Sequence, residues 1–236
     1  MNGYVKKIEV DVHDVDFNGV CRASSLLKYI QSAADAQLTD NGMSYDALRD
    51  SKRAFIISKI KVEFSDSVHA YDRIEAETFP CVSRGFSFLR CYALYREGKI
   101  IGRAISVWAL IDTDTRRLIK VNDFDLNLPV CEPHDMELVY FRMPDMASVV
   151  GEYTVSYSDL DRNMHVNNTK YADIFANFLP LLGKRIESMT ISYVNEAKYR
   201  DKLTVYLAEE NGLYYVRTVR PDGKVNAEAE IKLTNI

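Results

Sequence analysis

A short segment in the second half of the chain concentrates the side chains that acid–base chemistry requires. Asp161, Asn163 and His165 stand at every second position, directly before a stretch with the apolar periodicity of a helix. A carboxylate and an imidazole can transfer protons or activate water, and an amide can hold a substrate by hydrogen bonds. The types and spacing of these residues predict an active site for acid–base or nucleophilic chemistry.

An earlier segment repeats this pattern without its imidazole. The pattern Asp-(Leu or Val)-Asp-x-Asn begins at Asp14 and again at Asp159, 145 positions later, but Val20 stands where the second copy has His165. The second copy is therefore expected to carry the chemistry. The first copy is expected to form turns and caps only, through Asp14, Asp16 and Asn18.

A second correspondence indicates that the whole chain is duplicated. Residues 62–72 match residues 191–201 at an offset of 129. The smaller offset predicts roughly sixteen extra residues in the first half, which we place in the polar stretch 39–52.

Each half predicts one helix. In the first half, Ser24 is the expected N-cap of a helix whose apolar positions run from Leu26 to Leu38. In the second half, Asn167 or Asn168 is the expected cap. The apolar positions of the second helix are Tyr171, Ile174, Phe175, Phe178 and Leu182.

Alternating apolar and polar runs predict antiparallel strands after each helix, with hairpin turns at residues 97–98 and 221–223. A helix wrapped by a curved antiparallel sheet is the arrangement of a hotdog fold. The expected class is therefore α+β, a double (tandem) hotdog joined along its sheets. Three of the six prolines, Pro129, Pro133 and Pro144, lie in a stretch with little periodicity. The predicted parts are an N-terminal hotdog (1–125), a linker (126–145) and a C-terminal hotdog (146–236).

Composition narrows the classes of function. The 236 residues are 47% hydrophobic and 27% charged with a net charge of −4, and no basic run or membrane-length apolar run occurs. We expect no nucleic-acid partner, no membrane insertion and a cytoplasmic location. Four cysteines without a Cys-x-x-Cys pair predict free thiols and no zinc site.

The second motif resembles the signature of a known family. The run Asp161-x-Asn163-x-His165-Val166-Asn167-Asn168-x-Lys170-Tyr171 is similar to that of the acyl-acyl carrier protein (ACP) thioesterases, hotdog enzymes that end fatty acid synthesis in plants and many bacteria. The order of the first-half segment 16–19, the long helix, the Pro-rich linker and the C-terminal hotdog extends the likeness over nearly the whole chain. The chain has no transit extension like that of the plant members, so it looks like a bacterial enzyme.

The resemblance implies hydrolysis of acyl-ACP to a free fatty acid and holo-ACP. It implies no metal and no dissociable cofactor, because the phosphopantetheine arm arrives on ACP. It also places an acid on the strand after the helix, where this chain has Glu196, followed by Ala197 in place of the cysteine of many plant relatives. The implied roles are Asp161 as nucleophile or general base, Glu196 as a second carboxylate acting on water, His165 as proton shuttle and Asn163 as positioner. Without the resemblance, a lone strand glutamate is more often a solvated surface residue.

Three further sets of residues complete the predicted site. The backbone N–H groups of Val166, Asn167 and Asn168 open the helix and are the expected donors to the thioester carbonyl. The acyl tail is expected in the N-terminal half, which keeps a long apolar helix but lacks the histidine, beside Ile30, Ala34, Ile60 and Val107. Candidate contacts to the acidic ACP are Lys170, Lys184, Arg185, Lys198, Arg200 and Lys202.

The sequence leaves two other functions open, an acyl-CoA thioesterase of the same fold and a non-catalytic acyl-thioester-binding hotdog protein. It also leaves open whether the chain is a monomer or a homodimer, and which acyl chains it prefers.

Overall fold

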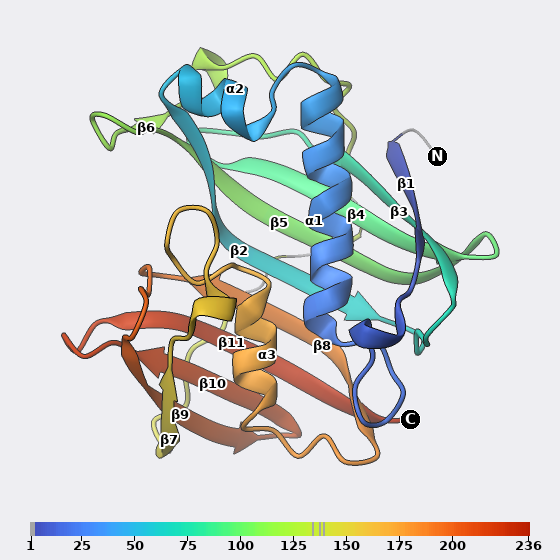
Figure 1. Ribbon diagram of the computed structural model, residues 1–236, viewed down its shortest axis with the longest axis vertical. Coiled ribbons are helices and arrows are strands. Elements are labelled where there is room, and N and C mark those ends of the chain that lie inside the picture. Colours follow the sequence, from blue (N-terminus) through green and yellow to red (C-terminus); the bar gives the residue numbers. More distant parts are fainter. Residues whose placement is uncertain (1–2, 134, 137, 139) are drawn as a thin grey trace.

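The structure is a computed structural model that describes residues 3–133, 135–136, 138 and 140–236. Its main element is one antiparallel sheet of 11 strands. The strand order is β1-β3-β4-β5-β2-β8-β11-β10-β9-β7, with β6 paired to β5. Strands β1 to β6 come from the first half of the chain and β7 to β11 from the second, so the sheet consists of two contiguous blocks (Figure 1). The expected double hotdog joined along its sheets is confirmed.

Each block follows the order predicted from the sequence, with a helix ahead of most of its strands. The first half contains β1 (Tyr4–Glu9), α1 (Ala23–Asp40), α2 (Tyr45–Asp50), β2 (Arg53–Phe64), β3 (Arg73–Pro80), β4 (Phe88–Arg96), β5 (Lys99–Asp112) and β6 (Leu118–Ile119). The second contains β7 (Ser148–Thr154), α3 (Lys170–Ala176), β8 (Lys184–Tyr193), β9 (Lys202–Glu210), β10 (Leu213–Val219) and β11 (Val225–Asn235). Short 3-10 helices are η1 (Val12–Asp14), η2 (Val121–Asp123) and η3 (Tyr157–Asp159).

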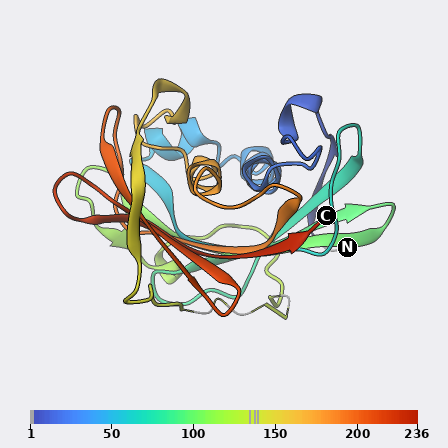
Figure 2. The same cartoon turned by 90° about the horizontal axis from the view of Figure 1, so that it is seen from below.

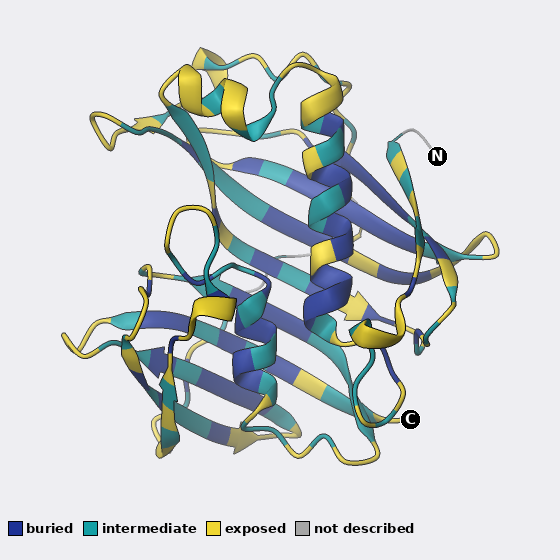
Figure 3. Cartoon of the chain, viewed as in Figure 1, coloured by how far each residue is buried: buried dark blue, intermediate teal, exposed yellow. Residues whose placement is uncertain are grey.

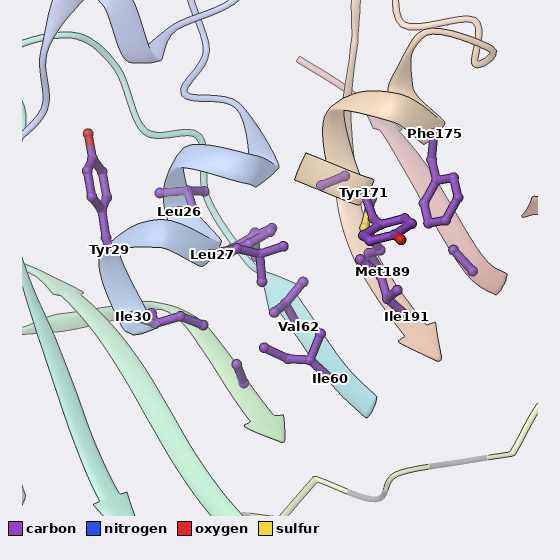
Figure 4. Close-up of a cluster of buried hydrophobic side chains, with 14 of the residues drawn as sticks. Leu26, Leu27, Tyr29, Ile30, Ile60, Val62, Tyr171, Phe175, Met189 and Ile191 are labelled. Carbon is purple, nitrogen blue, oxygen red and sulfur yellow. The ribbon is translucent and has the colours of Figure 1, made fainter. Parts of the chain in front are cut away.

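The two blocks meet where β2 pairs with β8. Ile60 lies opposite Ile191 and Val62 lies opposite Met189. Residues opposite each other across a ladder point to the same face, and all four side chains are at most 1% exposed. They form one apolar floor that receives side chains of α1 and of α3 (Figure 4). Fully burying a side chain of this size contributes about 1.5 to 3 kcal/mol, so this junction is a main source of cohesion between the halves.

Both long helices lie on the concave face of the sheet, side by side, and the segment after β6 runs along the opposite face (Figure 2). In that segment Met136 packs with Cys81, Cys91 and Ile105, and Met143 packs with Ala208. Buried residues follow the strands beneath the helices (Figure 3). Among the described residues, no helix combines the length and the apolar character needed to cross a bilayer.

The predicted N-cap of the first helix is wrong. The helix α1 begins at Ala23 with Arg22 as N-cap, so Ser24 lies inside its first turn and is buried. The neighbouring Ser25 Oγ donates to Asp14 Oδ1 at 2.9 Å. Ser25 therefore bonds to the loop before the helix, and Ser24 does not cap the helix end.

The predicted length of the second helix is also wrong. The helix α3 ends at Ala176, so Phe178 and Leu182 lie beyond it and Leu182 is largely exposed. Pro180 explains the stop, because a proline has no N–H and disfavours a helical conformation in the residue before it. At its start, Thr169 is the N-cap residue, and Asn167 Oδ1 accepts hydrogen bonds from the Thr169 amide and hydroxyl.

The duplication seen in the sequence extends to individual backbone hydrogen bonds. Cys21 N donates to Val68 O, and at the matching positions Val166 N donates to Ala197 O. The helix α1 continues well past the position that matches the end of α3, and α2 follows it. The extra residues of the first half therefore form the last turns of α1 as well as α2.

Asn18 fastens the first-half loop to the second half. Its Nδ2 donates to Leu181 O at 2.8 Å and to Lys184 O at 3.1 Å, and its Oδ1 accepts from Gly183 N at 3.1 Å. This agrees with its predicted role as a turn residue and adds a contact between the halves.

We expect Asn18→Ala to lower the free energy of unfolding by about 1 to 3 kcal/mol, because three hydrogen bonds are lost and the facing backbone groups lose their partner. Urea denaturation measures this change. The control Asn122→Ala, at an exposed asparagine of η2, should change stability by less than about 0.5 kcal/mol. Equal stabilities of the two variants would contradict the assigned role.

Candidate active site

The carboxylate of Asp161 holds the motif in a tight turn. Its Oδ1 accepts the N–H of Asn163 at 2.8 Å and the N–H of His165 at 3.2 Å. The Asp161 N–H in turn donates to His165 O at 2.8 Å. Met164 adopts a left-handed conformation with φ of 64°, as Gly19 does with φ of 75° at the matching position of the first half.

The same turn occurs in the first half with the same hydrogen bonds. Asp16 Oδ1 accepts from Asn18 N at 2.8 Å and from Val20 N at 3.2 Å. These bonds of Asp161 are therefore those of a turn former and require no catalytic role. Its Oδ2, which receives a long hydrogen bond of 3.4 Å from Asn163 Nδ2, is the oxygen left for chemistry.

The pair of His165 and Glu196 is the feature that the first half lacks. His165 Nε2 lies 3.1 Å from Glu196 Oε2, and the side chains are 25% and 53% exposed. The matching residues of the first half are Val20 and Ser67. An exposed ion pair contributes at most about 1 kcal/mol to stability, so the fold gains little from it. A neutral imidazole that donates Nε2–H to a carboxylate keeps Nδ1 as a proton acceptor, which is the arrangement of a general base.

A buried hydrogen-bond network supports the backbone around Glu196. Val194 N and Asn195 N both donate to Asn226 O. The fully buried Asn226 side chain donates to Asn195 O at 2.5 Å and to the Tyr171 hydroxyl at 2.8 Å. Burial raises the pKa of Tyr171 to about 12, so this hydroxyl stays neutral at physiological pH. Arg220 Nη1 adds a bond of 2.9 Å to Glu196 O.

This network has no signature in the sequence. The alternation of the last strand assigns Asn226 to the polar face with Glu228, yet Asn226 is buried where the chain of residues 193–197 crosses it. A partner so distant along the chain cannot be identified from one sequence.

Two of the three predicted oxyanion donors are already in use. Val166 N donates to Ala197 O at 3.0 Å, and Asn167 N donates to Asp159 O at 2.8 Å. These bonds fasten the loop to the chain beside Glu196, so the two N–H groups are not free for a substrate. Among the hydrogen bonds of the described chain, none uses the Asn168 N–H, which is left as the backbone donor.

The predicted acyl-lining residues do not all share one face of the sheet. Ile30, Ala34 and Ile60 belong to the core between α1 and the sheet. Val107 pairs with Lys59, one position away from the pair of Ile60 and Ser106. Because successive side chains of a strand point to opposite faces, Val107 faces away from the helices, and the prediction that it points inward with Ile60 is wrong.

A cavity lies at the first-half loop. It measures about 280 Å³, and its lining includes Asp16, Val20, Cys21, Ala172, Ala176 and Leu181. It therefore occupies the position that matches the catalytic loop in the other half, but it contains neither His165 nor Glu196. At the second-half loop, α2 covers the corresponding position: the Tyr45 hydroxyl donates to Asn163 Oδ1 at 2.7 Å.

Five of the six predicted ACP-binding cations fall into two groups, and Lys170 stands apart from both. Lys198 forms a backbone bridge with His165, and Arg200 and Lys202 follow it as exposed residues. Lys184 and Arg185 lie instead at the first-half loop, where Lys184 O accepts from Asn18 and Arg185 lines the cavity. Lys170 is 3.3 Å from Asp173. The exposed Arg162 and the half-buried Arg220 are two further cations near the site that the sequence analysis does not name. Arg162 stands at a variable position of the motif, and Arg220 lies far from the motif in the sequence.

No group of three or more metal-binding side chains converges in the part of the chain that the structure describes. Carboxylates, an imidazole and amides are the groups that the site offers for acting on a carbonyl and a water molecule.

Two family models match the chain. The model of the acyl-ACP thioesterase N-terminal domain matches residues 1–126, and the model of the C-terminal domain matches residues 143–235. Together they cover both halves of the sheet and the loop that carries His165.

Curated relatives are distant in sequence. The oleoyl-ACP thioesterase 2 of Arabidopsis thaliana chloroplasts is 25% identical over 224 residues, which are 84% of this chain and 60% of that protein. A chloroplastic acyl-ACP hydrolase of Cuphea viscosissima is 24% identical over 78% of this chain and 50% of its own length. The chain thus spans about half to three fifths of the length of these relatives.

Solved structures agree over the full fold. An acyl-ACP thioesterase from Bacteroides thetaiotaomicron superposes with a TM-score of 0.90 at 23% identity, covering 98% of this chain and 97% of that one. The 12:0-ACP thioesterase of Umbellularia californica gives a TM-score of 0.82 at 19% identity, covering 100% and 99%. These likenesses establish the fold.

Proposed function

The chain belongs to the acyl-ACP thioesterase family, and we propose that it hydrolyses the thioester of acyl-ACP to release a free fatty acid and holo-ACP. The observation that carries the proposal is the contact of 3.1 Å between His165 Nε2 and Glu196 Oε2. His165 stands on the loop where the family motif is complete, and Glu196 reaches it from the segment after β8.

Hydrolysis requires a nucleophile at the thioester carbonyl carbon. In the first route, Glu196 and His165 take a proton from water, whose oxygen attacks the carbon. The C–S bond breaks and the proton passes to the departing thiolate of the phosphopantetheine arm. In the second route, Asp161 Oδ2 attacks the carbon directly, and the C–S bond breaks as the thiolate leaves. Water then hydrolyses the resulting anhydride, which restores the Asp161 carboxylate and releases the fatty acid and a proton for the thiolate. The Asp161 carboxylate already holds two N–H groups through Oδ1, which favours the first route.

The carbonyl oxygen needs donors while it carries negative charge. The Asn168 N–H and the Asn163 side-chain amide are the remaining donors that can bond to this oxygen. Neither route uses a metal or a dissociable cofactor, because the substrate brings its own phosphopantetheine.

For the acyl tail we keep the N-terminal half as the proposed binding region. Ile30, Ala34 and Ile60 supply an apolar wall between α1 and the sheet. The gap beside Ile30, Phe64 and Tyr92 has no room for a water molecule, so a tail that enters there must displace side chains.

We further propose that the protein acts in fatty acid biosynthesis in the cytoplasm. No disulfide joins its four cysteines, three of which are buried, and this suits a reducing compartment. A monomer suffices for the reaction, since both halves of the site belong to one chain.

The assay for this function is the release of free thiol from acyl-ACPs and acyl-CoAs of graded length. We expect His165→Ala to lower kcat by about two orders of magnitude or more, because a positioned acid–base group is lost, while the chain stays folded. Asp161→Ala should lower kcat as much, because its carboxylate holds the N–H groups of Asn163 and His165 and is the nucleophile of the second route. His13→Ala, at an exposed histidine of η1, is the control and should keep the wild-type rate. Near-wild-type turnover by His165→Ala would refute the assignment. Binding of acyl-ACP without turnover by the wild-type chain would favour the non-catalytic alternative.

We expect a preference for acyl-ACP over acyl-CoA. ACP is acidic, and complementary charge mainly accelerates encounter, with salt screening it over about 8 Å at physiological ionic strength. The kcat/KM on acyl-ACP should fall as salt rises, and the charge reversals Lys198→Glu and Arg200→Glu together should lower it more than the value on acyl-CoA. The matched control reverses Lys7 and Arg73, which are exposed at the opposite edge of the sheet. Equal rates on the two carriers without a salt effect would favour the acyl-CoA alternative.

A further inference from the structure

The short helix α2 touches the catalytic loop through three side-chain contacts. Its first residue, Tyr45, donates its hydroxyl hydrogen to Asn163 Oδ1 at 2.7 Å. The guanidinium of Arg162 lies 4.1 Å from the centre of the Tyr45 ring. Arg162 Nη2 also donates to Asp46 Oδ1 at 2.9 Å. The first half of the chain therefore reaches the loop of the second half with this helix.

This helix belongs to the residues that the second half does not repeat. None of its residues is buried, so it adds little to the apolar core. Its polar contacts go to Asn163 and Arg162. These two residues lie between Asp161 and His165 in the sequence.

The hydrogen bond from Tyr45 fixes which way the Asn163 amide points. A hydroxyl that donates to Oδ1 leaves Nδ2 on the other side, where it lies 3.4 Å from Asp161 Oδ2. The flipped amide would place an oxygen against the Asp161 carboxylate, and its NH₂ group would face the Tyr45 hydroxyl. One Nδ2 hydrogen then points to Asp161, and the second is free to donate to a substrate oxygen.

The matching asparagine of the first half also contacts the opposite half, but it has no histidine beside it. There Asn18 bonds to the backbone of Leu181, Gly183 and Lys184, the segment after α3. The partners of Asn18 are backbone groups, which are present whatever side chains these positions carry. In the second half the partner of the matching asparagine is one phenolic oxygen on a segment after α1, so a single substitution can remove it.

We propose that Tyr45 is a positioning residue of the thioesterase reaction: through its hydroxyl it holds the Asn163 amide in the orientation that directs Nδ2 toward Asp161 and the substrate. This inference rests on the proposed function. Tyr45 itself touches Asn163 and not the reacting atoms. Its loss leaves substrate binding in place but lowers the fraction of complexes in which the amide donates correctly, so kcat falls and KM changes little.

The test variant is Tyr45→Phe, which keeps the ring beneath Arg162 and removes one oxygen atom. We expect kcat on acyl-ACP to fall about tenfold, the size expected for one hydrogen bond, with KM within about twofold and an unchanged unfolding temperature. The matched control is Tyr4→Phe. The Tyr4 hydroxyl makes an equally short bond of 2.7 Å to Asp40 Oδ2, but on the β1 side of α1, so its loss should leave kcat unchanged.

A double-mutant cycle separates positioning through Asn163 from any other effect. In the Asn163→Ala background, Tyr45→Phe should lower kcat no further, because the group that it positions is absent. A tenfold loss that persists in that background would overturn the inference, as would wild-type kcat in Tyr45→Phe alone. If the wild-type chain hydrolyses neither acyl-ACP nor acyl-CoA, the proposed function is wrong and the inference falls with it. Active wild type with an unaffected Tyr45→Phe overturns the inference alone.

Discussion

The pairing of β2 with β8 is the constraint on which the rest of the structure depends. Five residue pairs, from Lys59 with Ser192 to Glu63 with Ser188, join two sheets into one. The apolar floor at this junction places α1 and α3 side by side on one face. Each motif loop then meets the segment that follows the helix of the opposite half: Asn18 meets residues 181–184, and Asn163 meets Tyr45. The candidate site is consequently a product of both halves, although its acid–base groups come from one.

Comparison of the two motif loops distinguishes the residues that form the turn from those proposed to carry out the chemistry. Asp16 and Asp161 make the same two hydrogen bonds at the same distances, so the carboxylate is retained where no histidine follows it. The imidazole and its carboxylate partner are present once. The first-half loop forms the same turn without these two side chains. His165 and Glu196 can therefore be substituted without loss of the turn. The open cavity at the first-half loop and the covering helix at the second show the same asymmetry on a larger scale.

The duplication and the double hotdog follow from the sequence, because a repeated motif is a local pattern. The family signature names His165 and Glu196 as site residues, but their contact is seen only in the structure. Other features depend on contacts that no local pattern carries. Asn226 is buried by residues distant in the chain, and the N–H groups of Val166 and Asn167 are occupied by the chain beside Glu196 and by Asp159. Val107 lies in an almost continuous apolar run whose two faces look alike in sequence. For α3 the apolar spacing continued beyond Pro180, and the stop signal of proline outweighed it.

The central claim is that His165 and Glu196 act as one unit. The most direct measurement is kcat on one acyl-ACP for the wild type, His165→Ala, Glu196→Gln and the double variant, each checked for an intact fold. If the two residues serve the same proton transfer, we expect the double variant to lose no more activity than the more damaging single variant, since the effects of groups that act together are strongly non-additive. Losses that multiply, or an unchanged rate in Glu196→Gln, would contradict the account and leave Glu196 as a surface partner of His165.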